Sequence, residues 1–213
     1  MLFNNTMTRR IGLLGGSFNP AHRGHRATSL AAMEALGLDE VWWLVSPGNP
    51  LKPKKGMAPL AARLESARYI ARRSRIEVKD FETRVGTIYT VDTVAALLGH
   101  YPRHDFIWLM GADTVTQFHQ WKQWRRLAAL VPIAVLPRPG YDGPARAARA
   151  MGWLRGFVRP AATASEWTKW SAPAITFLRL PPDPTSATQL RGQDPFWHRR
   201  QPGDAAHPSP TLS

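Results

Sequence analysis

The chain alternates short runs of apolar residues with longer segments in which apolar residues recur every three or four positions. The first pattern is typical of buried strands and the second of amphipathic helices. Predicted strands occupy residues 11–15, 40–46, 75–81, 105–111, 131–140 and 174–181. Predicted helices occupy residues 25–37, 59–74, 89–101 and 185–192, residues 113–130 are predicted to form one or two helices, and residues 143–156 are compatible with a helix. This alternation predicts a doubly wound, Rossmann-like α/β fold, in which helices cover both faces of a parallel sheet.

All of these elements fall within residues 9–192, which we predict to form a single domain. We expect residues 1–8 to be flexible. Residues 193–213 are too rich in proline and polar residues to bury a core, so we predict a disordered tail there. Residues 141–173 have weaker periodicity, and both a lid and a subunit contact are open interpretations for them.

The composition limits the class of protein. The 213 residues are 44% hydrophobic and include nine Trp, which is enough for one sizeable core. The absence of cysteine excludes disulfides and thiolate metal sites. The first ten residues lack the apolar core of a signal peptide, and no segment approaches the roughly 18 apolar residues of a membrane span. We therefore expect a cytoplasmic protein without a membrane partner.

The chain is strongly basic, with 28 Lys and Arg against 15 Asp and Glu and a net charge of +13. Such a charge attracts phosphates, whether in nucleotides, nucleic acids or acidic lipids. The excess is spread along the chain, which disfavours a dedicated nucleic-acid-binding arm.

The stretch GGSFNPAHRGHR carries the most informative chemistry. Gly15, Gly16 and Ser17 follow the first predicted strand, where a doubly wound sheet binds ligands and a helix N-terminus favours anions. The spacing matches neither GxGxxG nor a P-loop. His22 and His25 can donate hydrogen bonds to phosphate oxygens, although a solvated helix and a zinc site are alternative interpretations. The residues alone therefore indicate a polyphosphate site.

The same stretch resembles the GxFxPxHxGH signature of the nucleotidylyltransferase superfamily. Later segments resemble one branch, the bacterial nicotinate-nucleotide adenylyltransferases, in the family's order: SPGNPLK, YTVDT, GADTVTQFHQW, RPG and SATQLR. The resemblance spans residues 11–191. It implies adenylyl transfer from ATP to nicotinate mononucleotide in NAD biosynthesis, with Mg²⁺ carried by ATP and no dedicated protein metal site.

The resemblance also implies roles for individual residues. The catalytic candidates are His22, His25 and Arg191, which would act as positive donors to the triphosphate. The ATP-binding candidates are Gly15, Gly16, Ser17, Phe18, Gly111, Asp113, Ser186 and Thr188. For Asp113, Ser186 and Thr188, helix capping is the alternative interpretation.

The second substrate has its own predicted residues, which are Lys52, Tyr89, Thr90, Trp121 and Arg138. The resemblance implies that Trp121 stacks on the pyridine ring and that Thr90, supported by Tyr89, contacts the nicotinate carboxylate. Lys52 and Arg138 are candidates for the substrate phosphate.

Rival interpretations differ in the acceptor or in the class of protein. Nicotinamide mononucleotide and phosphopantetheine are alternative acceptors for the same fold. A nucleic-acid-binding module would explain the charge but not the glycine and histidine junction, so we expect no nucleic-acid partner.

Two departures from the family stand out: Asn19 where many members carry Asp, and no further helix pattern after SATQLR. The sequence does not determine an oligomeric state.

Overall fold

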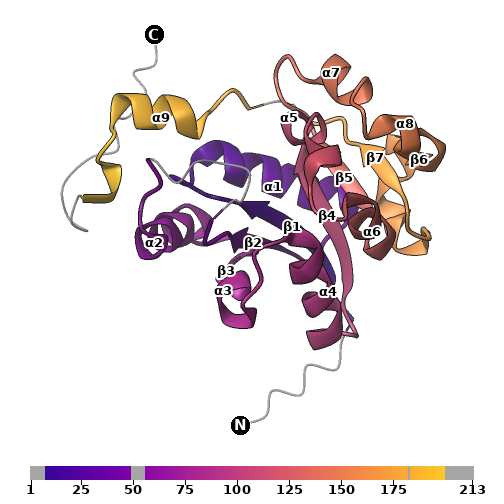
Figure 1. Cartoon of the computed structure of the whole chain (residues 1–213), viewed down its shortest axis with the longest axis horizontal. Helices are drawn as coiled ribbons and strands as arrows, with labels where there is room; N and C mark the ends of the chain where they lie inside the picture. The colour runs from indigo at the N-terminus through magenta and orange to yellow at the C-terminus, as the bar shows by residue number, and fades with distance from the viewer. Residues whose placement is uncertain (1–7, 49–55, 182, 200–213) are drawn as a thin grey trace.

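The computed structural model describes residues 8–48, 56–181 and 183–199, and a single parallel sheet lies at its centre (Figure 1). The seven strands follow the order β3-β2-β1-β4-β5-β7-β6, and all paired strands are parallel. The strands are β1 (Arg10–Gly16), β2 (Glu40–Val45), β3 (Ile76–Lys79), β4 (Asp105–Gly111), β5 (Ile133–Leu136), β6 (Val158–Arg159) and β7 (Ile175–Phe177). The predicted fold class is confirmed.

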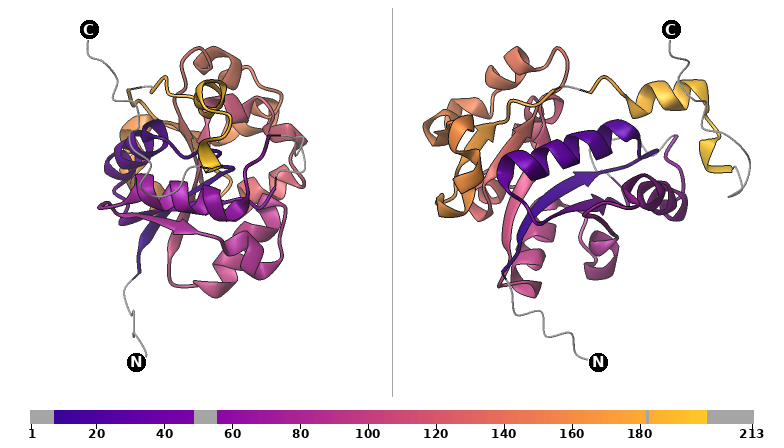
Figure 2. Two further views of the ribbon diagram at one scale, coloured as in Figure 1. Left: turned by 90° about the vertical axis from the view of Figure 1, so that its left-hand side faces the viewer. Right: turned by 180° about the vertical axis from the view of Figure 1, so that it is seen from behind.

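Helices cover both faces of this sheet (Figure 2). The α-helices are α1 (Arg23–Leu36), α2 (Leu60–Ala71), α3 (Phe81–Val85), α4 (Thr90–His100), α5 (Ala112–Val115), α6 (Trp124–Leu130), α7 (Asp142–Arg146), α8 (Met151–Leu154) and α9 (Ala187–Gln193). The 3₁₀ helices are η1 (Phe118–Gln120), η2 (Arg155–Phe157), η3 (Ala161–Lys169) and η4 (Trp197–Arg199). Buried residues of α1, α2 and η3 form one core, and those of α4, α6 and α8 belong to the other.

Strand β2 shows how one sequence segment serves both cores. Side chains alternate between the faces of a strand, so the adjacent Trp42 and Trp43 enter different cores, and both are buried. The indole N–H of Trp43 donates to Ser29 Oγ of α1 at 2.9 Å. An uninterrupted apolar run is therefore what a strand covered on both faces requires.

One predicted strand needs correction, and two segments that the sequence left open are resolved. The strand predicted for residues 75–81 ends at Lys79, and the short helix α3 follows, ended by Gly86 with a φ of 68°. Residues 113–130, predicted to form one or two helices, lie in α5, the 3₁₀ helix η1 and α6. Residues 141–173 form α7, α8, η2, η3 and the edge strand β6, so the segment 143–156 that was compatible with a helix contains helical turns.

The two ends of the chain lie largely outside the described residues. Residues 1–7 and 200–213 belong to the segments predicted to be flexible or disordered, so those predictions stay open. Within the described part of the predicted tail, α9 ends at Gln193 and η4 follows. Among the described helices, none combines the length and apolar character that crossing a bilayer demands.

Candidate active site

The predicted site residues converge where the strand order of the sheet reverses. β1 is paired with β2 on one side and β4 on the other, and the connections after β1 and β4 lead to opposite faces of the sheet. Gly16 ends β1 and Gly111 ends β4, at the same edge of the sheet. Ligands of doubly wound sheets bind at this topological switch point.

The loop after β1 is shaped by close packing. A Cβ on Gly15 would lie 2.6 Å from Cη2 of the buried Trp108, so a side chain at this position has no room. Phe18 has a φ of 45°, and its ring stacks on Trp43 with centroids 4.9 Å apart. Because the Phe18 side chain is buried, only its backbone can face a nucleotide.

The two histidines meet at the start of α1. His22 is the N-cap residue, and the helix begins at Arg23, two residues earlier than predicted. The backbone N–H of His22 donates to Nδ1 of His25 at 3.3 Å, and the ring centroids lie 3.8 Å apart. Since Nδ1 of His25 is an acceptor, a neutral His25 carries its proton on Nε2.

The surroundings of both imidazoles disfavour their charged forms. Burial and the charge of Arg138 lower the pKa of His22 to about 4, against an opposing effect of Asp183. Burial, followed by the neighbouring His22 and Arg138, also holds the pKa of His25 well below its usual value. Arg138 contributes to this effect on both histidines.

Residues 183–191, before and within α9, contact the loop between β1 and α1, although they lie near the other end of the chain. Ser186 Oγ accepts a hydrogen bond from the Thr188 N–H at 3.2 Å, so Ser186 caps α9. Arg191 donates to the Asn19 carbonyl at 2.6 Å and to Thr188 Oγ1 at 3.1 Å. The structure therefore brings Ser186, Thr188 and Arg191 to the loop that precedes the histidines.

Arg138 lies among the groups predicted for ATP, although the sequence assigned it to the acceptor phosphate. Its Nε is 3.7 Å from Asp113 Oδ1, and its Nη1 donates to the Thr185 carbonyl at 3.4 Å. It also acts electrostatically on both histidines. Asp113 is not a helix N-cap, because Gly111 takes that position for α5.

The residues predicted for the pyridine ring lie around the N-terminus of α4. Tyr89 is the N-cap residue of this helix and leaves its first amides without a capping side chain. Trp121 is partly buried against Trp108 and Phe118, with ring centroids 6.3 and 5.5 Å away. Trp108 also limits the space at Gly15, so its indole lies between Trp121 and the loop that follows β1, which we call the nucleotide loop. Lys52 lies outside the described residues.

Four residues that the sequence analysis did not single out also face this region. Asp183 accepts from the Thr185 N–H at 2.8 Å, and this bond and the charge of Arg23 lower its pKa, although burial opposes the shift. Lys122 places its ammonium 4.2 Å from the Tyr89 ring centroid and 3.2 Å from Asp92.

The other two residues are buried. Burial raises the pKa of Glu82 on α3 to about 7, against a hydrogen bond from Ser46 that lowers it. Arg63 shares the buried face of α2 with Leu64, Ala67 and Ala71. An arginine on the apolar stripe of a predicted helix was the available sequence signal for Arg63.

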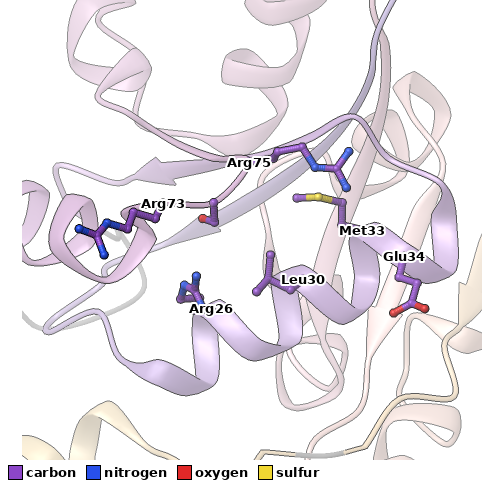
Figure 3. A pocket seen from close by; sticks show the side chains of 7 residues that line it. Arg26, Leu30, Met33, Glu34, Arg73 and Arg75 are labelled. Carbon is purple, nitrogen blue, oxygen red and sulfur yellow. The ribbon is translucent and has the colours of Figure 1, made fainter.

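One surface cavity among the described residues is separate from the strand ends. It has a volume of about 740 Å³ and lies between α1 and the segment 73–75. Figure 3 shows Leu30 and Met33 of α1 between Arg26 at one end and Arg75 at the other. None of the predicted site residues lines it. Its position away from the switch point makes it a poor candidate for the reaction.

The site contains hydrogen-bond donors and positively charged side chains but few side chains that could ligate a metal ion. No group of three or more His, Cys, Asp or Glu side chains in the described ranges is arranged to hold a metal ion. Asp113 is a single carboxylate beside β4, and its Oδ1 accepts no hydrogen bond from a described residue. One carboxylate fits a Mg²⁺ ion that keeps its waters and arrives on substrate phosphates.

Comparison with known proteins identifies the class to which this fold and site belong. The protein-family model described as cytidylyltransferase-like matches residues 13–193. The chain is therefore a member of this nucleotidyltransferase class, and the match covers most of β1, both histidines and α9.

Relatives within the class are more specific. The chain is 57% identical over 193 residues to a probable nicotinate-nucleotide adenylyltransferase of Erythrobacter litoralis, covering 91% of this chain and 88% of the relative. It is 52% identical to a protein of the same description from Gluconobacter oxydans, covering 88% and 96%. The chain belongs to the nicotinate-nucleotide adenylyltransferase family, and the resemblance found in its sequence is confirmed.

A solved structure agrees with the fold. The nicotinic acid mononucleotide adenylyltransferase of Plasmodium falciparum, complexed with NaAD, superposes with a TM-score of 0.63 over 86% of this chain and 83% of that chain. The two sequences are only 15% identical, so this likeness concerns the architecture alone.

Proposed function

We propose that the protein transfers the adenylyl group of ATP to the phosphate of nicotinate mononucleotide. An oxygen of that phosphate attacks the α phosphorus of ATP, the bond from this phosphorus to the bridging oxygen breaks, and pyrophosphate leaves with the electron pair. The products are nicotinate adenine dinucleotide and pyrophosphate. The observation that carries the proposal is the convergence of His22, His25, Arg138 and the segment 183–191 at the N-terminus of α1.

The chemistry needs positioning and charge neutralisation more than proton transfer. The attacking phosphate is already an anion, so no general base is required. Nε2–H of His25 is a donor whose orientation is held by the hydrogen bond at Nδ1. Fixed donors near the departing pyrophosphate stabilise charge that develops in the transition state. Arg138 supplies positive charge beside them.

Magnesium fits the site as a companion of ATP. When bound, it neutralises phosphate charge and polarises the phosphoryl oxygens. Asp113 is the residue best placed to take part in holding it, directly or through water, because its carboxylate lies beside Arg138 at the end of β4. The role of Asp113 in this proposal is to hold and orient.

The acceptor side is built from α4 and the residues around Trp121. The free amides at the start of α4 favour a carboxylate, and Thr90 is the first residue of that helix. Lys122 lies one residue after Trp121, with its ammonium over Tyr89 and paired with Asp92 in the first turn of α4. The helix N-terminus favours an acid over a neutral amide, which supports nicotinate as the substrate, and Lys122 can strengthen this preference if it turns from Asp92 to the substrate.

The test is pyrophosphate release from ATP and Mg²⁺ in the presence of nicotinate mononucleotide, nicotinamide mononucleotide or phosphopantetheine. We expect release with the nicotinate compound at a kcat/KM well above that of the other two. Equal rates with the amide would overturn the assigned specificity. If folded protein that binds ATP releases no pyrophosphate with any of the three compounds, the assignment of the acceptor is wrong.

Two further parts of the proposal concern the setting of the reaction. We place the enzyme in the cytoplasm, in agreement with its lack of cysteine. We assign the net charge of +13 to substrates that are polyanions. Salt-dependent retention on a DNA or RNA column that ATP does not reverse would instead support a nucleic-acid-binding protein.

A further inference from the structure

Arg63 is a buried arginine whose hydrogen-bond partners are all backbone carbonyls. The residue is 1% exposed. Nε donates to the Ala58 carbonyl at 3.0 Å. Nη1 donates to the carbonyls of Ser17 at 2.8 Å and Ser46 at 2.7 Å, and Nη2 donates to that of Pro47 at 3.4 Å. Among the described residues, Arg63 forms no ion pair with a carboxylate.

Burying a guanidinium in this way costs free energy of folding, which an apolar side chain of similar size would not. Burial lowers the pKa of Arg63, but a guanidinium remains charged at neutral pH. Burying a charge without a counter-charge costs free energy of folding that its hydrogen bonds must offset. The carbonyls that Arg63 holds are therefore the best guide to its role.

These carbonyls belong to the loops that follow two neighbouring strands. Ser17 follows β1, while Ser46 and Pro47 follow β2. Ala58 lies at the far end of the β2–α2 connection, just before α2 begins. The Asn19 side chain makes a second tie, because its Nδ2 donates to the Gly56 carbonyl at 2.9 Å and its Oδ1 accepts from the Ala58 N–H at 3.2 Å. Arg63 and Asn19 thus hold both ends of the β2–α2 connection to the nucleotide loop.

The bond to Ser17 also sets the direction of a peptide unit. The Ser17–Phe18 peptide is trans, so its carbonyl and its N–H point in opposite directions. With the carbonyl fixed on the Arg63 guanidinium, the Phe18 N–H faces away from that guanidinium. Phe18 has a positive φ of 45°, which a residue other than glycine keeps only when its surroundings hold it.

We propose that Arg63 is a positioning residue for adenylyl transfer. It orients the Phe18 N–H toward the nucleotide and fixes the loops after β1 and β2 relative to each other. The proposal rests on the assigned ATP site. Arg63 contacts no substrate in this arrangement and acts through the peptide that it holds. A displacement of about 1 Å in such a loop can cost on the order of 100-fold in rate.

The test compares Arg63→Lys with a matched variant on the same helix, Leu64→Ala. Leu64 is buried in the core beneath α2 and binds neither loop, so its truncation destabilises the protein without freeing the carbonyls. With nicotinate mononucleotide and ATP, we expect Arg63→Lys to lower kcat/KM by about 30-fold or more. Leu64→Ala should stay within about 3-fold of the wild type at a temperature where both are folded. Equal, small losses in the two variants would show that Arg63 is only structural.

Two further measurements keep the proposal falsifiable. In Arg63→Ala, added methylguanidinium should recover part of the lost kcat, and it should have no effect on Leu64→Ala. Hydrogen exchange should accelerate at residues 17–18 and 46–47 in Arg63→Lys but not in Leu64→Ala. Unchanged exchange at both loops would overturn the proposal. This readout does not depend on the acceptor, so it separates a failure of this inference from a wild type that releases no pyrophosphate.

Discussion

Replacing Gly15 by Ala should disturb both substrate regions through one contact. The added Cβ would lie 2.6 Å from Cη2 of Trp108, whereas carbon atoms pack at roughly 3.5–4.0 Å, so the indole or the strand end must move by about 1 Å. Trp108 is 2% exposed and packed in the hydrophobic core, so its neighbours must shift with it. Overpacking of this kind costs about 1–3 kcal/mol. For a domain of this size, about 2 kcal/mol corresponds to a fall in Tm of about 4–8 °C.

The same displacement should reach the site. Gly15 precedes the nucleotide loop, and Trp108 supports Trp121, so we expect kcat/KM for pyrophosphate release to fall by about 10- to 100-fold. The φ of Gly15 lies outside the left-handed region, which leaves the contact with Trp108 as the only source of strain.

Calorimetry and steady-state kinetics on Gly15→Ala and a control variant, Gly99→Ala, would test this reasoning. Gly99 lies in α4 and is exposed, and a Cβ added there would meet nothing within 4 Å. Its replacement should raise stability by about 0.5–1 kcal/mol and leave the kinetics unchanged. A Gly15→Ala variant with wild-type Tm and kcat/KM would refute the packing argument.

Three other changes have defined outcomes. His25→Ala should lower kcat by about 100-fold or more with a much smaller change in KM for ATP, measured at saturating acceptor; a loss confined to KM would argue against transition-state stabilisation. Lys122→Met should reduce the ratio of kcat/KM for nicotinate to that for nicotinamide mononucleotide by about three- to tenfold, and an unchanged ratio would remove Lys122 from acid recognition. The pKa of Glu82 is raised to about 7 in the folded protein, from 4.5 when unfolded, so its contribution to stability is complete below pH 4.5 and is lost as the pH rises to 7. Glu82→Gln should therefore raise Tm at pH 8 more than at pH 5, and melting curves with the same difference at both pH values would contradict this pKa.

Much of the architecture was predictable because strand and helix periodicity is a local property. The six predicted strands all exist, and the uninterrupted apolar run of β2 indicated correctly a sheet covered on both faces. Short elements escaped prediction. Helix α3 has five residues and β6 has two, which is too few for a period to emerge. Both owe their stability to packing and pairing partners from other parts of the chain.

The candidate site likewise has residues that the sequence predicted and features that it did not. Gly15, Gly16, His22 and His25 stand close together in the sequence, so their spacing and their place after a strand were enough to predict a phosphate site. The neighbourhood of Arg138 was not predictable, and the structure places it beside Asp113 and close enough to His22 to lower its pKa. The protonation of the histidines also depends on burial, which lowers the pKa of both.

The sequence by itself determined the fold class, the family and the position of the glycine and histidine junction, since each is encoded in patterns and motifs whose residues are near neighbours along the chain. Only the tertiary structure decided how distant segments complete that junction. Arg191 reaches the Asn19 carbonyl across 172 positions, and Arg63 reaches Ser17 across 46. Hydrogen bonds of this kind depend on where the sheet brings loops together, and no local pattern of hydrophobic and polar residues specifies them.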